Sequence, residues 1–113
     1  MGLYKEEERI CRERGDRNWL QGSLGNQAVI LKARGDFDGA MGLYKEQERI
    51  CREMGYKEGL ARSLANQALL LRDMRRSRDG LRLAEEAYQL ASSHGLTALA
   101  QQIKPILDRL RSQ

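Results

Sequence analysis

The sequence predicts an all-α protein, a right-handed solenoid of helical hairpins, and three observations carry this prediction. A segment of 40 residues repeats without a gap, apolar residues recur at helical spacing within each period, and glycines separate the helical segments. Stacked repeats bury a continuous core that no single unit can bury alone. We therefore expect one domain over residues 1–113, with about six antiparallel helices.

The repeat is direct. The block MGLYKEEERICRE at residues 1–13 returns as MGLYKEQERICRE at 41–53, and SLGNQA at 23–28 returns as SLANQA at 63–68. A third, diverged copy begins near Leu81 and keeps a glycine, Gly95, at the matching position. The predicted units are therefore 1–40, 41–80 and 81–113, and the last one ends in a capping helix.

Apolar stripes and glycine terminators set the expected helix boundaries. Gly35 is expected to end one helix because glycine adopts the left-handed conformation cheaply, and Asp36 is expected to cap the next one. Pro105 lies inside the final segment, where it removes one hydrogen bond and should kink the helix. The predicted helices cover residues 2–14, 18–34, 37–54, 57–74, 79–94 and 96–111.

The charge pattern, the apolar runs and the few cysteine and histidine residues limit the kinds of function to expect. The net charge is +4, but acidic and basic residues are interleaved along most of the chain, and no apolar run approaches the length of a membrane-spanning helix. We expect a cytoplasmic protein without a membrane segment. Cys11 and Cys51 have no neighbouring ligand pattern and should be reduced thiols, and His94 should cap a helix end. These residues predict no metal, no cofactor and no enzymatic activity.

One stretch of the sequence resembles a known repeat family. Residues 28–44, AVILKARGDFDGAMGLY, resemble the tetratricopeptide (TPR) core pattern, in which Gly35 and Ala40 match the most specific positions. The lengthened unit is similar to the long repeats of kinesin light chain, nephrocystin-3 and the spindle-orientation adaptors. The second linker departs from the pattern, because residues 75–80, RRSRDG, stand where GDFDGA stands in the first. The resemblance implies a protein-binding adaptor or scaffold with a concave helical face.

The phase of the core stripe predicts which residues line that face. Asn26 and Asn66 are of most interest, since an amide offers both a donor and an acceptor to an extended peptide, and the resemblance implies groove asparagines at this position. The alternative is that the repeated Asn-Gln pair only bridges helices. Lys32 and Arg72 could pair with an acidic peptide or could be solvated helix ends. The expected groove residues are Asn26, Val29, Lys32, Asn66, Leu69 and Arg72.

A basic cluster follows in the second linker, where Arg75, Arg76, Arg78 and Arg82 come soon after Arg72. A solvated turn is the favoured interpretation, and contact with an acidic partner is the next. Phosphate or RNA binding ranks last because no aromatic residues are interleaved to stack bases.

The main alternative to a peptide receptor is a structural module that associates with itself. About two and a half repeats are few for an array that must bury its own ends. The chain could thus belong to a longer array, or form a homo-oligomer, with helices exchanged around the linker at residues 35–39.

Overall fold

The protein folds as a stack of helices. The computed structural model describes residues 16–112, and within that range no strand occurs. The helices are α2 (Arg17–Ala33), α3 (Phe37–Met54), α4 (Lys57–Asp73), α5 (Ser77–Ser93) and α6 (Thr97–Arg111). The all-α prediction is confirmed. The helix predicted over residues 2–14 and the thiol of Cys11 lie outside the described residues.

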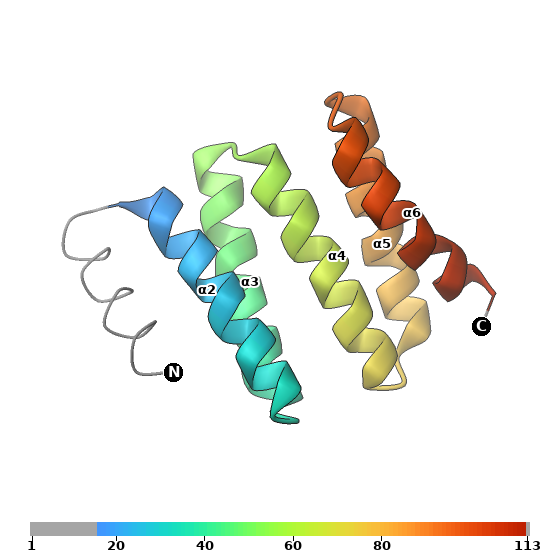
Figure 1. The fold of residues 1–113 in the computed structure, drawn as a ribbon, viewed down its shortest axis with the longest axis horizontal. Helices are drawn as coiled ribbons and strands as arrows, with labels where there is room; N and C mark the ends of the chain where they lie inside the picture. Colours follow the sequence, from blue (N-terminus) through green and yellow to red (C-terminus); the bar gives the residue numbers. More distant parts are fainter. Residues whose placement is uncertain (1–15, 113) are drawn as a thin grey trace.

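The five helices form two layers (Figure 1). Each helix packs antiparallel against the next one in the chain, and α4 also contacts both α2 and α6. By contrast, the backbones of α3 and α5 do not approach closely, and these two helices meet through side chains, as in the 3.0 Å ion pair between Arg52 and Glu86. Because the backbones of α2, α4 and α6 lie closer together than those of α3 and α5, the stack curves toward α2, α4 and α6. We call the surface that these three helices form the inner face.

Local chemistry explains where the helices begin and end. Asp36 caps α3, since its carboxylate accepts a hydrogen bond of 2.9 Å from the backbone N–H of Gly39, and Asp16 caps α2 in the same way. Gly35, Gly55 and Gly95 follow helices in the left-handed conformation, with φ of 86°, 70° and 70°. Most boundaries agree with the prediction within one residue. Helix α5 is the exception, because it starts at Ser77 rather than at residue 79.

The turn between α4 and α5 keeps the shape of the other turns without their glycine. Arg75 occupies the position of Gly35 and has a φ of 62°. The backbone N–H of Arg76 then bonds to the carbonyl of Leu71, as the N–H of Asp36 bonds to that of Leu31. Arg76 replaces the capping aspartate, and no side chain caps α5. The changed linker sequence therefore alters the chemistry of the turn more than its path.

Alanines lie where the two layers approach most closely. Ala28 of α2 and Ala40 of α3 share one fully buried cluster with Tyr44. Forty residues further on, Gly80 of α5 lies against Ala68 of α4, and a Cβ placed on Gly80 would be 2.8 Å from the carbonyl oxygen of Ala68. The predicted core stripe is thus buried, and α6 continues it through Ile103, Leu107 and Leu110 on both sides of Pro105.

No helix in the described range is long and apolar enough to cross a membrane. Cys51 is buried and free, and His94 ends α5, where its Nδ1 lies 3.0 Å from the carbonyl oxygen of Leu90. Residues 16–112 bring together no group of three His, Cys, Asp or Glu side chains able to hold a metal ion.

Candidate functional site

A hollow of about 210 Å³ opens on the inner face between α2 and α4. Helix α2 forms one wall, the N-terminal half of α4 forms the other, and one side chain of α3 reaches between them from the second layer. The hollow is lined by Gln21, Gly22, Gly25, Asn26, Val29, Gln47, Tyr56, Gly59, Arg62 and Asn66. This hollow, which we call the inner-face hollow, contains three of the six predicted groove residues.

Asn26 and Asn66 lie in this hollow on opposite walls, although they are 40 residues apart in the sequence. Asn26 is exposed and Asn66 is half-buried. Neither side chain has a hydrogen-bond partner within residues 16–112. Val29 lies beside them and is 54% exposed, so it adds an apolar surface to the polar one. Two amides that make no hydrogen bond to the described part of the chain thus lie beside one apolar side chain.

The other three predicted groove residues lie outside this hollow. Lys32 and Arg72 both approach the same carboxylate, that of Asp73, with N–O distances of 3.4 Å and 3.5 Å. The Lys32 contact joins α2 to α4 near their ends. Leu69 is half-buried and does not line the hollow. Asp73 therefore already balances part of the positive charge that the sequence offered to an acidic ligand.

The glutamine of the second Asn-Gln pair, Gln67, bridges two helices, as the alternative to ligand binding expected. Gln67 is fully buried, and its Nε2 donates a hydrogen bond of 2.9 Å to Glu48 Oε1, which ties α4 to α3. Ser63, one turn earlier, donates a bond of 2.8 Å to the carbonyl oxygen of Tyr44. The two members of the pair thus differ: the glutamine joins the layers, and the asparagine beside it faces outward into the hollow.

Charge in the hollow is balanced. Arg62, the only charged residue in its lining within residues 16–112, makes a 2.9 Å ion pair with Glu58 one turn earlier on the same helix. The rest of the lining is amide, glycine, aromatic and aliphatic. This environment suits a neutral ligand with several donors and acceptors better than a multiply charged one.

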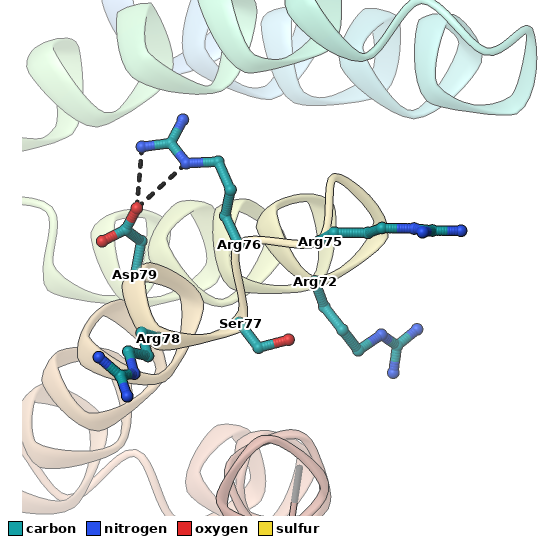
Figure 2. Close-up of a pocket in the computed structure, with 6 residues that line it drawn as sticks. All are labelled: Arg72, Arg75, Arg76, Ser77, Arg78 and Asp79. Carbon is teal, nitrogen blue, oxygen red and sulfur yellow. Dashed lines mark hydrogen bonds and ion pairs between the residues drawn. The ribbon is translucent and has the colours of Figure 1, made fainter.

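The predicted basic cluster surrounds the α4–α5 turn (Figure 2). A broad, open hollow of about 740 Å³ is lined there by Arg72, Arg75, Arg76, Ser77, Arg78 and Asp79. Asp79 binds Arg76 at 2.8 Å and Arg82 at 3.3 Å, and Arg82 does not line this hollow. In Figure 2 the Arg76 side chain turns toward Asp79 and away from the direction of Arg72 and Arg75.

Two guanidinium groups of this cluster have no partner within residues 16–112, those of Arg75 and Arg78. Arg75 and Arg78 point in different directions in the close-up view (Figure 2), so they do not converge on one point. The cluster thus combines local ion pairs around Asp79 with two guanidinium groups that point apart.

Sequence reasoning missed most of the hollow's remaining lining, above all Gly25 and Gln47. A comparison of the two repeats carries a signal for this pair. Position 25 is glycine where position 65 is alanine, and position 47 is glutamine where position 87 is alanine. These two differences face each other in the fold, because the Gln47 amide lies directly against Gly25.

Neither a scan against protein-family models nor a search of curated proteins finds a match for this chain. Its function is therefore inferred from its own residues and their geometry.

Proposed function

We propose that this chain is a TPR-like protein-interaction module that binds an extended polypeptide segment on its inner face. The observation that carries the proposal is the pair Asn26 and Asn66, which line one hollow from opposite walls without partners among the described side chains. A peptide backbone presents N–H and C=O groups in alternation, and an amide side chain can bond to either. Two such amides can therefore hold a main chain with little regard to its side chains.

The surroundings of the two asparagines support a neutral segment. Arg62 is already paired with Glu58, and Lys32 and Arg72 already share Asp73. Val29 gives an apolar contact that a side chain of the bound segment can cover. We infer that the adaptor prefers an uncharged, partly apolar stretch of a partner protein over an acidic tail.

The test removes the two amides together. Linear peptides selected from a random library against the wild-type chain serve as probes, and the double variant Asn26→Ala/Asn66→Ala should bind them at least about tenfold more weakly. This figure follows from two hydrogen bonds of about 1 kcal/mol each. Gln89→Ala, which removes an exposed amide from α5 in the other layer, is the matched control and should leave binding unchanged.

Two results would overturn the proposal: a selection that yields no binding peptide, or equal affinity in the double variant. Sedimentation of the unliganded chain over a wide concentration range tests the self-association considered above. A dimer that persists on dilution, together with a failed selection, would favour the self-associating module instead.

A further inference from the structure

The floor of the inner-face hollow is formed by a side chain from the other layer. Gln47 belongs to α3, is only 5% exposed, and lines the hollow together with Asn26 and Asn66. It reaches the hollow beneath Gly25 of α2. A Cβ at position 25 would lie 2.8 Å from Gln47 Nε2 and 3.3 Å from its Cδ and Oε1. The missing side chain of Gly25 thus provides the space in which this amide lies.

Neighbouring hydrogen bonds fix which way the amide faces. Gln47 Nε2 donates to Gln21 Oε1 at 3.1 Å, and Cys51 Sγ donates to the same oxygen at 3.5 Å. The thiol keeps its proton at neutral pH, as an ordinary thiol does, and burial raises the pKa of Cys51 further, to about 11. With Gln21 Oε1 receiving two donors, the Nε2 of Gln47 must face it, and the carbonyl oxygen of Gln47 faces elsewhere.

That carbonyl oxygen, Gln47 Oε1, is buried and has no hydrogen-bond partner within residues 16–112. A buried acceptor without a donor is unfavourable, since the group has lost its water and gained nothing in return. Native proteins satisfy nearly all such groups, and an exception calls for an explanation. Here the residue that carries the acceptor, Gln47, lines the hollow that we propose as the binding site, although the oxygen itself is covered in the unliganded chain.

The second repeat shows that the fold does not need this amide. The matching positions are Ala65 and Ala87, both buried, so an alanine pair fills the space that Gly25 and Gln47 fill in the first. The pairing of a glycine at position 25 with the glutamine amide of Gln47 beneath it is therefore specific to the hollow between α2 and α4.

We infer that Gln47 is a binding residue of the inner face, whose Oε1 accepts a hydrogen bond from a main-chain N–H of the bound segment. This inference rests on the proposed function. A main-chain N–H fits because the acceptor is neutral and because Arg62, the only charged residue among the described lining of the hollow, is already paired. Asn26 and Asn66 line the same hollow as Gln47.

The chain supplies its own set of test variants. Gly25→Ala places a Cβ against the amide and displaces it, and Gln47→Ala removes it. The double variant Gly25→Ala/Gln47→Ala rebuilds the alanine pair that the second repeat already contains, so it should fold. Gly42→Ala is the matched control, because Gly42 also lies inside a helix and a Cβ there meets nothing within 4 Å, but it is exposed and does not line the hollow.

Affinity for the library-selected peptides is the first readout. The double variant should bind about fivefold to tenfold more weakly, as expected for one lost hydrogen bond, and Gly42→Ala should bind like the wild type. Methylating the peptide nitrogens one at a time should weaken wild-type binding strongly at one position, and that position should lose its effect in the double variant. Peptides that bind the double variant and the wild type equally would overturn the role of Gln47 while leaving the proposed function intact.

A second probe works even if no peptide is selected. N-methylacetamide, the smallest mimic of a peptide bond, is titrated while the side-chain amide resonances are followed by NMR. The Gln47 signal should shift and approach saturation in the wild type, and that of the exposed Gln89 should not. In Gly25→Ala the Gln47 shift should disappear. Equal behaviour of the two glutamines would mean that this acceptor takes no hydrogen bond from a peptide group, which would overturn the inference.

Discussion

Arg75 holds, in the turn between α4 and α5, the left-handed conformation that Gly35 holds in the turn between α2 and α3. Their φ angles are 62° and 86°, and the two positions are 40 residues apart. A residue with a Cβ pays about 1–2 kcal/mol for this conformation, and glycine does not. The rest of the turn, closed by the bond from Arg76 N to the carbonyl of Leu71, forces Arg75 to accept it.

The first prediction follows from this strain. Arg75→Gly should raise the free energy of unfolding by about 0.5–1 kcal/mol, because the relief of strain exceeds the extra chain entropy that glycine gives the unfolded state. Urea denaturation with an unchanged slope would measure the gain. Arg75→Ala is the control, since it removes the guanidinium but keeps the strained backbone. If both variants gained equally, the cause would be relief of charge repulsion and not backbone strain.

A second prediction concerns the closest approach of α4 and α5. Gly80→Ala should destabilise the protein by about 1–3 kcal/mol, as overpacking does, although alanine is the better helix former. The reason is the 2.8 Å distance from the new Cβ to the backbone oxygen of Ala68, which cannot move without shifting its helix. The midpoint of thermal or urea unfolding would report the loss.

The matched change on a neighbouring helix should have the opposite sign. Gly42 lies inside α3 on its exposed side, and a Cβ there meets nothing within 4 Å. Gly42→Ala should therefore stabilise by about 1 kcal/mol, the propensity difference alone. Stabilisation of similar size at both positions would show that α4 and α5 can separate freely.

The fold could be predicted from the sequence because the same pattern of apolar stripes and glycines occurs in two copies, 40 residues apart. Gly35 and Gly55 end helices where the left-handed conformation is needed, and the apolar stripe fixes which side of each helix is buried. The start of α5 was predicted two residues late, since the run from Arg75 to Arg78 reads as a polar linker. Nothing local reveals that Arg75 takes the role of a glycine; the packing on both sides of the turn imposes it.

The candidate site was predictable only in part. Helical phase placed Asn26 and Asn66 on one face because their side chains project from one layer. Phase could not show that Asp73 meets both Lys32 and Arg72, since that contact depends on how α2 and α4 sit against each other. Gln47 could not be predicted as a lining residue for a related reason. It enters the hollow from the other layer, through a space that exists only because position 25 lacks a side chain.

The third prediction concerns the thiol beside that floor. Burial raises the pKa of Cys51 to about 11, against an ordinary value of 9.0. Between these values the unfolded chain releases the thiol proton and the folded protein retains it, so stability should fall as the pH rises from about 9 to about 11. Below about pH 9 the thiol is protonated in both states, so it does not make the free energy of unfolding depend on pH. The full effect is on the order of 1.4 kcal/mol for each unit of pKa difference.

Comparison with Cys51→Ala isolates the thiol from other groups that titrate at high pH. Tyr44, whose pKa burial also raises, contributes equally to both proteins and cancels in the difference. Both are made in a Cys11→Ser background so that only one thiol is present, and urea unfolding is followed from about pH 8 to about pH 11. The variant should start less stable and lose less with rising pH. Parallel curves would mean that the Cys51 thiol ionises as readily in the folded protein as in the unfolded chain, and the donor that orients Gln21 toward Gln47 would then be lost at the same pH.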